Sequence, residues 1–189
     1  MLLCQISDLH IKTEGALLCR MVDTAGLLRR CVGHIAALRP QPDALIVTGD
    51  LVDSGGAEEY AFLRELLAPL KMPMYLIPGN HDERQAMRGA FADHSWMSGR
   101  ERIEYVINTH PLRIVALDTV IPGKSGGQVS TDSMAWLDQV LAAEPDRPTV
   151  VLMHHPPFAS GIVYMDRMGL DNAHLLADRK STRLNSSNA

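Results

Sequence analysis

The chain has 189 residues, a length that suits one domain with a sizeable buried core. Its composition, 46% hydrophobic and 21% charged, is typical of a globular protein and excludes a disordered or fibrous chain. The formal net charge is -4 and no basic stripe is visible, which argues against a dedicated nucleic-acid-binding surface.

The cysteines and the first residues indicate a compartment. Cys4, Cys19 and Cys31 are odd in number and follow no metal-binding spacing, which favours free thiols in a reducing environment. The opening MLLCQISDLH lacks the basic region of a signal peptide, and no segment has the ~20 apolar residues that a membrane helix needs. We therefore expect a cytoplasmic protein without a membrane partner.

Short apolar runs alternate with longer helical patterns in the first half of the chain. The expected elements are a strand at Leu2–Ile6, a helix around 28–38 that RPQP ends, a strand at Ala44–Val47, a helix at Ala57–Leu70, a strand at Met74–Ile77 and a short helix at Glu83–Ala92. This alternation is typical of a mostly parallel sheet.

The second half changes character. Two strand-like runs flank Asn-Thr-His-Pro at 108–111, which predicts an antiparallel hairpin. Thr131 is expected to cap a helix, and residues 148–153 form the last clear strand. The hairpin makes the sheet mixed, or it supplies a second sheet.

Polar residues follow each predicted core strand. The four strand ends read Ser7-Asp8-Leu9-His10, Thr48-Gly49-Asp50, Gly79-Asn80-His81-Asp82 and His154-His155-Pro156-Pro157. Ligands bind outside the carboxyl ends of strands in open α/β sheets, so the sequence predicts one shared site. Each motif alone also has an ordinary structural explanation, such as a turn or a corner, but their joint occurrence favours a site. The glycines before Asp50 and Asn80 are expected to permit sharp turns.

The residue types at these strand ends indicate metal ions. Carboxylate, amide and imidazole groups without a thiolate suit Mn, Fe, Co or Zn. Ligands from so many strands favour two ions that share a carboxylate, and two-metal sites clamp a phosphoryl group and activate a water molecule.

These motifs, D-x-H, G-D, G-N-H-D and H-x-P in this order, resemble those of the calcineurin-like metallophosphoesterases. The resemblance is closest to the branch of class III cyclic-nucleotide phosphodiesterases and glycerophosphodiesterases, and it extends from Met1 to about Ala177. The segments that carry it are ISDLH, VTGDLV, EEY, YLIPGNHDE, TDSMAWL and MHHPPF. The resemblance implies an α/β fold of the metallophosphoesterase type: a mixed β-sheet sandwich flanked by helices in αββα layers.

The resemblance also implies a dinuclear centre of two divalent or trivalent transition-metal ions (Fe, Mn, Co or Zn). Asp8 and His10 would hold the first ion, Asp50 would bridge both ions, and Asn80 and His154 would hold the second. A metal-bridging hydroxide would attack the phosphorus of the substrate.

Three further residues receive roles from the resemblance. His81 is the expected catalytic residue, which contacts the phosphate and protonates or stabilises the leaving oxygen. Asp82 would orient His81, and His155 would either line the substrate pocket or support the corner. Ordinary surface or packing roles are expected for His34, His94 and His110.

The implied activity is that of a phosphoric diester hydrolase, such as a 3',5'-cyclic-nucleotide phosphodiesterase, on a small-molecule phosphodiester. A glycerophosphodiester is the other substrate class. The alternatives are a non-catalytic scaffold with the same fold, or a nuclease or phosphomonoesterase of the same superfamily; a nuclease would more often show a basic channel. A homo-oligomer of the full-length protein stays open.

The sequence departs from the family pattern near its end. The family's G-H-x-H segment has no counterpart, and His174 is the only histidine after His155. The last residues, RKSTRLNSSNA, are polar and rich in Ser and Asn. We therefore expect a phosphoesterase domain over 1–177 that is incomplete at its C-terminus, a non-native polar tail over 178–189, and impaired activity of this fragment.

Overall fold

The computed structural model describes residues 1–97 and 99–176. It contains two three-stranded sheets, with the strand orders β1-β2-β3 and β4-β5-β6. The strands are β1 (Leu3–Ile6), β2 (Ala44–Thr48), β3 (Met74–Ile77), β4 (Tyr105–Ile107), β5 (Arg113–Ala116) and β6 (Thr149–Leu152). The first sheet is parallel throughout, whereas β4 is antiparallel and β6 parallel to β5. The expected hairpin is therefore confirmed, and it belongs to a second sheet.

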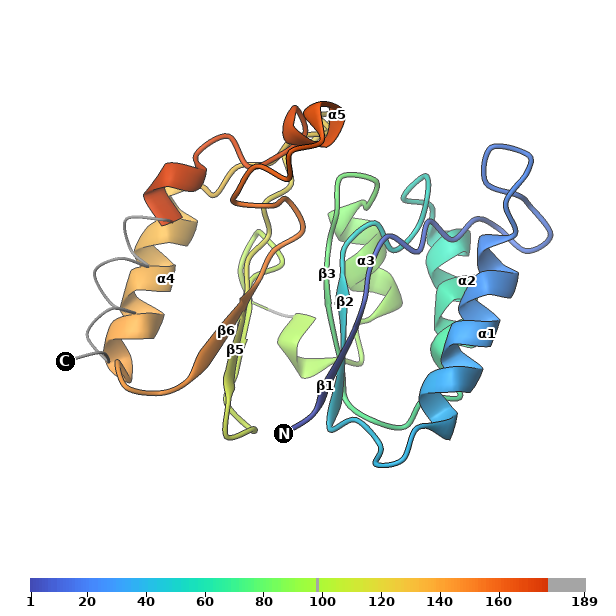
Figure 1. The fold of residues 1–189 in the computed structure, drawn as a ribbon, viewed down its shortest axis with the longest axis horizontal. Helices are drawn as coiled ribbons and strands as arrows, with labels where there is room; N and C mark the ends of the chain where they lie inside the picture. Colours follow the sequence, from blue (N-terminus) through green and yellow to red (C-terminus); the bar gives the residue numbers. More distant parts are fainter. Residues whose placement is uncertain (98, 177–189) are drawn as a thin grey trace.

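The helices of the described residues are α1 (Thr24–Ala37), α2 (Ala57–Leu67), α3 (Arg84–Ala90), the 3-10 helix at Ser95–Met97, α4 (Thr131–Ala143) and α5 (Val163–Asp166). The three longest of them cover the outer faces of the two sheets (Figure 1). Figure 1 shows α1 and α2 outside the first sheet and α4 outside the second, with the two sheets between them. This arrangement confirms the αββα sandwich.

Two apolar clusters fill the space between these layers. Alternate residues of β5 face opposite ways, as the pleat of a strand requires. Ile114 and Ala116 belong to the large cluster that also includes residues of the first sheet. Val115 belongs, with Met134 and Leu137 of α4, to the smaller cluster. The strand is buried on both faces, which explains why its sequence is apolar throughout its central part.

Element boundaries differ from the expectations at several places. Helix α2 ends at Leu67 rather than Leu70. Glu83 caps α3 instead of belonging to it, because its side chain accepts from the Ala86 amide. The prediction that Thr131 caps α4 is wrong, because Ser130 accepts from the Ser133 amide at 3.0 Å and Thr131 is the first helical residue. Ser, like Thr, is a favoured capping residue, so the two were hard to separate by sequence.

The expected polar tail, 178–189, lies outside the described residues. Within the described residues, no helix combines the length and the apolar character needed to cross a membrane.

Candidate metal centre

The turns after β1 and β2 lie side by side because their backbones remain paired beyond the strands. The Asp8 amide donates to Gly49 O at 3.1 Å, and the His10 amide donates to Asp50 O at 2.9 Å. Asp8, His10 and Asp50 have φ values of 55°, 43° and 48°, in the left-handed region that non-glycine residues rarely adopt. Such strain persists only where surrounding contacts enforce it, and it is common at functional sites.

Both predicted glycines are required, but for different reasons. Gly49 has a φ of 91°, which confirms that it turns the chain sharply before Asp50. Gly79 instead permits a close approach, since a Cβ there would lie 2.2 Å from Asp50 Oδ1. A Cβ on Gly49 would also meet His154 Nδ1 at 2.4 Å. The absence of these two side chains therefore leaves room for the Asp50 carboxylate and the His154 ring.

The buried Asp50 carboxylate lies between two imidazoles. His10 Nε2 lies 3.5 Å from Asp50 Oδ2, and His154 Nε2 lies 3.5 Å from Asp50 Oδ1. Two donors that each bind one cation at about 2.1 Å in tetrahedral geometry are about 3.4 Å apart. Both separations therefore fit a cation shared between each histidine and Asp50, and the residues present suit a two-metal centre.

The other expected ligands lie on the same turns. One ligand atom each from Asp8, His10 and Asp50 can be chosen so that all lie within 4.8 Å of one another. Asn80 is half-buried on the turn after β3, next to His81, whose amide donates to Asp50 Oδ1 at 3.0 Å. The structure thus brings residues from three strand ends of the first sheet to the Asp50 carboxylate.

The second sheet contributes His154, whose orientation is set by a backbone carbonyl. Its Nδ1 lies 2.9 Å from Thr48 O, an atom that can only accept, so Nδ1 carries the proton. The lone pair of Nε2 then faces Asp50, which is the arrangement that metal-binding histidines use.

His81 is exposed, with 40% of its side chain accessible. Its Nδ1 lies 2.7 Å from the backbone oxygen of Asp53, and its ring meets that of His10 edge-on, with centroids 4.6 Å apart. His81 can therefore contact a molecule bound at the edge of the sheet while one ring nitrogen stays anchored.

Asp53 is not among the residues predicted from the sequence, although it contacts the site. Its carboxylate lies 3.5 Å from His10 Nδ1 and 2.6 Å from Lys12 Nζ. Burial opposes ionisation of Asp53, but the hydrogen bond from Lys12 and the nearby positive charges outweigh it, so the pKa of this carboxyl is lowered. Asp53 lies three residues after Asp50, on the turn that follows β2, and this position is the feature of the sequence that could have identified it as a site residue.

Asp82 supports the loop rather than the ring of His81. Its buried carboxylate accepts from the amides of Gly79, Leu51 and Val52 and from the Tyr60 hydroxyl. Burial raises the pKa of Asp82 to about 6. Among the described residues, the bonds of this carboxylate go to the backbone and Tyr60, whereas the His81 ring is anchored by Asp53. The expected orienting role of Asp82 is therefore replaced by support of the backbone beneath His81.

His155 is 2% exposed, and its Nδ1 lies 2.7 Å from Thr119 Oγ1. Burial, with a contribution from neighbouring His154, lowers the pKa of His155 to about 4. Of the two roles considered for it, this position fits support of the corner rather than a place in an open pocket.

The other histidines lie apart from these turns. His34 is exposed on α1, His94 packs between Phe91 and Trp96, and the Nε2 of His110 lies 2.9 Å from the Tyr75 hydroxyl. These positions agree with surface or packing roles.

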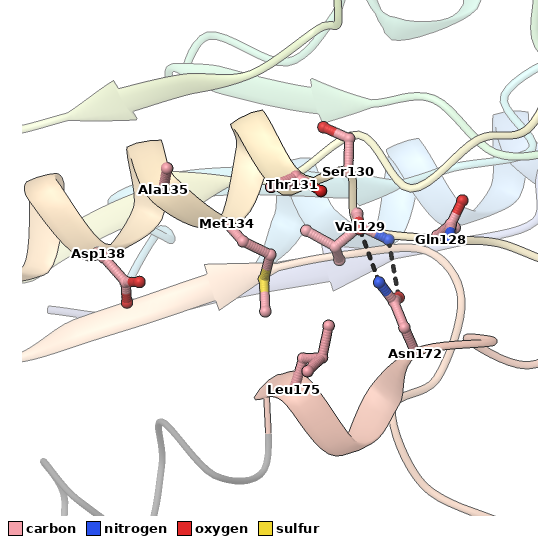
Figure 2. Close-up of a pocket in the computed structure, with 9 residues that line it drawn as sticks. All are labelled: Gln128, Val129, Ser130, Thr131, Met134, Ala135, Asp138, Asn172 and Leu175. Carbon is pink, nitrogen blue, oxygen red and sulfur yellow. Dashed lines mark hydrogen bonds between the residues drawn. The ribbon is translucent and has the colours of Figure 1, made fainter.

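A pocket of about 620 Å³ lies elsewhere, between the start of α4 and the segment around Asn172 (Figure 2). Asn172 closes one side by a double hydrogen bond with the backbone of Val129. The lining contains none of the expected metal ligands and consists of Gln128, Val129, Ser130, Thr131, Met134, Ala135, Asp138, Asn172 and Leu175. The candidate metal ligands therefore lie on the turns around Asp50 and not in the lining of this pocket.

Comparisons with known proteins agree with this geometry. The sequence model of the family described as Calcineurin-like phosphoesterase matches residues 1–179. The chain is 39% identical to a probable glycerophosphodiester phosphodiesterase GpdQ from Arcobacter nitrofigilis, over 90% of this chain and 62% of the relative. It is 33% identical to the 3',5'-cyclic adenosine monophosphate phosphodiesterase CpdA of Pseudomonas aeruginosa, over 94% of this chain and 63% of the relative.

The chain thus spans less than two thirds of the length of both relatives. The solved structure of TT1561 from Thermus thermophilus has the same fold, with a TM-score of 0.59 at 15% identity, over 96% of this chain and 76% of that one. The match to the family model covers nearly the whole chain, and residues of the D-x-H, G-D, G-N-H-D and H-x-P motifs meet around Asp50. The chain belongs to the calcineurin-like phosphoesterase family.

Proposed function

We propose that this chain carries the dinuclear metal centre of a phosphodiesterase that hydrolyses a small phosphodiester. The observation that supports this most is the Asp50 carboxylate, each oxygen of which faces one imidazole nitrogen at 3.5 Å. A carboxylate in this position suits a bridge between two cations. Burial of this carboxylate would otherwise be costly, since one hydrogen bond from the His81 amide does not balance a buried negative charge.

Each side of the centre would use residues from different strand ends. Asp8 and His10 would hold one ion together with Asp50, and Asn80 and His154 would hold the other together with Asp50. When bound, the ions supply Lewis-acid activation of water and of the phosphoryl oxygens. The chain's own contribution is to orient these ligands: Thr48 O fixes the His154 tautomer, and paired backbones hold Asp8 and His10 against β2.

His81 would act on the leaving oxygen of the substrate. Because Asp53 O only accepts, the proton on Nδ1 is committed to that bond, and Nε2 is the nitrogen available to a substrate oxygen. To donate from Nε2, the ring must be an imidazolium. The Asp53 carboxylate lies beside the same ring, 3.8 Å from Nδ1.

The substrate class follows from the relatives only as a proposal. Both relatives named above carry the name of a phosphodiesterase, one for glycerophosphodiesters and one for cyclic AMP. We propose that the substrate is a 3',5'-cyclic nucleotide or a glycerophosphodiester. A non-catalytic scaffold is less compatible with the site, because a scaffold would not need strained turns that direct Asp8, His10 and Asp50 to one point.

The test is hydrolysis of bis(p-nitrophenyl) phosphate by this chain and by the full-length protein, in parallel with metal analysis. We expect turnover that requires Mn, Co, Fe or Zn and disappears with a chelator. A His34→Ala variant serves as a matched control, since this exposed histidine lies on α1. Activity that persists in metal-free protein would refute the proposal. Cyclic AMP and glycerophosphodiesters, assayed next, distinguish the two substrate classes.

A further inference from the structure

The candidate centre joins two sheets that share no strand pairing among the described residues. Asp8, His10, Asp50 and Asn80 follow strands of the first sheet, whereas His154 follows β6 of the second. The 3.5 Å approach of His154 Nε2 to Asp50 Oδ1 therefore depends on how the sheets are placed against each other at this edge. A small shift of one sheet would separate the two donors.

An ion pair ties the two sheets together near this edge. Arg84 is the first residue of α3, on the side of the first sheet, and Asp118 follows β5 of the second. Arg84 Nε lies 2.6 Å from Asp118 Oδ2, and Arg84 Nη2 lies 2.8 Å from Oδ1. The Asp118 side chain is fully buried and also accepts from the amides of Ile103 and Val120. This two-pronged contact fixes both distance and orientation.

Thr119 extends the connection to the loop that carries His154. Thr119 Oγ1 lies 2.7 Å from Nδ1 of His155, and both residues are buried. His155 directly follows His154, while Arg84 lies four residues after Asn80 on the opposite side. A continuous path of hydrogen bonds and chain therefore links the two loops that would hold the second ion.

We propose that Arg84, Asp118 and Thr119 are positioning residues for the second metal ion. They would set the distance between its ligands on the first sheet, Asp50 and Asn80, and its ligand on the second sheet, His154. This inference rests on the proposed function, which assigns Asn80 and His154 to that site. The alternative is a purely stabilising role. A buried ion pair is a poor source of net stability, and its better-supported use is to specify one arrangement. The location of this pair, at the junction of the sheets and beside both loops, favours the positioning role.

The test compares Arg84→Lys and Thr119→Val with the unmodified chain. Arg84→Lys keeps a charge opposite Asp118 but loses the two-pronged contact. Thr119→Val keeps the shape of the side chain but loses the hydrogen bond to His155. In Mn²⁺ titrations by calorimetry, we expect the affinity of one site to fall about 10- to 100-fold, while the other site, made by the first sheet alone, changes by less than about twofold.

Arg113→Lys is the matched control. Arg113 is also buried, and its guanidinium bonds to Thr149 and to the backbone oxygens of Val140 and Glu144. All three partners belong to the second sheet and to the end of α4, away from the junction. This variant should keep the relative Mn²⁺ affinities of the two sites unchanged.

The outcomes separate this inference from the proposed function. An unmodified chain that binds no Mn²⁺, together with a full-length protein that hydrolyses no phosphodiester, would overturn both. An unmodified chain that binds two ions, with variants that bind both as tightly, would overturn the positioning role alone. An equal loss of affinity at both sites would mark general destabilisation and would overturn it as well. Circular dichroism of each variant checks that folded protein is being compared.

Discussion

The two halves of the molecule reach the candidate centre in different ways. In the first sheet, three neighbouring parallel strands end in polar turns, and backbone bonds such as Asp8 N to Gly49 O hold these turns together. The second sheet reaches the centre through His154, whose position depends on contacts with Thr48 and Asp50 of the other sheet. The first half therefore builds its part by local pairing, whereas the second half depends on tertiary packing.

The halves also differ in exposure. Strand β2 is buried along its whole length, whereas β6 is only half-buried at Thr149–Val151. After the His154 corner, Phe158, Val163 and Tyr164 are each at least 70% exposed. Partly exposed edge strands and apolar surface favour association with other chains. The second half is therefore the part of this chain in which we expect perturbations to disturb the packing most readily.

Removal of Asp50 should have the largest effect, because its carboxylate serves both halves. Asp50→Ala should lose both ions, whereas His154→Ala should lose only the ion that the second half helps to hold. Loss of Lewis-acid assistance worth several kcal/mol corresponds to a fall in activity of about three orders of magnitude. Metal content and turnover of the purified variants are the measurements. Retention of one tightly bound ion by Asp50→Ala would show that Asp50 does not bridge.

His81→Ala should separate chemistry from metal binding within the first half. The expected result is a fall in kcat of about 10²- to 10⁴-fold, because a positioned proton donor is lost, with metal content nearly unchanged. Metal analysis and steady-state kinetics check this. If His81→Ala lost more metal than Asp50→Ala, the roles of ligand and proton donor would have to be exchanged.

The buried His155 should make the second half sensitive to acid. Burial lowers its pKa from 6.5 to about 4, so between these values the unfolded chain binds a proton that the folded chain excludes. The stabilising contribution is fully present above pH 6.5 and is lost as the pH falls towards 4. It amounts to about 3 kcal/mol at most. Denaturant unfolding of metal-free protein across this range should show the loss, and His155→Gln should flatten the pH dependence; an equal slope in both proteins would contradict the assignment.

Among these substitutions, that of Gly79 should have the smallest effect. It should disturb the packing around Asp50. A Cβ at this position would lie 2.2 Å from Asp50 Oδ1, so Gly79→Ala should destabilise the fold by about 1–3 kcal/mol. At Gly89 in α3, no atom lies within 4 Å of the place that a Cβ would occupy, so Gly89→Ala should instead stabilise the helix by about 0.5–1 kcal/mol. Urea unfolding measures both, and destabilisation of equal size would refute the steric argument.

Much of the first half could be predicted from the sequence. The strand at Met74–Ile77 has the expected bounds, and the polar motifs lie at the carboxyl ends of their strands. These features depend on local patterns: apolar runs of strand length, and Gly followed by Asp or Asn where the chain turns. Parallel pairing then brings the turns together without further information.

The role of Asp82 and the importance of Asp53 could not be predicted in the same way. In sequence, Asp82 is adjacent to His81, yet its carboxylate points to the amides of Leu51 and Val52, which are about thirty positions away along the chain. Adjacent side chains on a turn need not face each other. The partner of a ring is therefore decided by the neighbouring strand end rather than by the neighbouring residue.

By itself, the sequence determined the order of strands and helices, the polar strand ends and the candidate ligands Asp8, His10, Asp50, Asn80 and His154. Only the tertiary structure decided that Asp50 faces two imidazoles, that Asp53 anchors His81 and that Arg84 pairs with Asp118. The physical reason is the separation of the interacting residues along the chain. Strand and turn patterns depend on residues close in the chain, whereas these contacts join segments at least 28 positions apart. Pairing within the first sheet brings His10 to Asp50 and His81 to Asp53, and the packing of one sheet on the other brings His154 to Asp50 and Arg84 to Asp118.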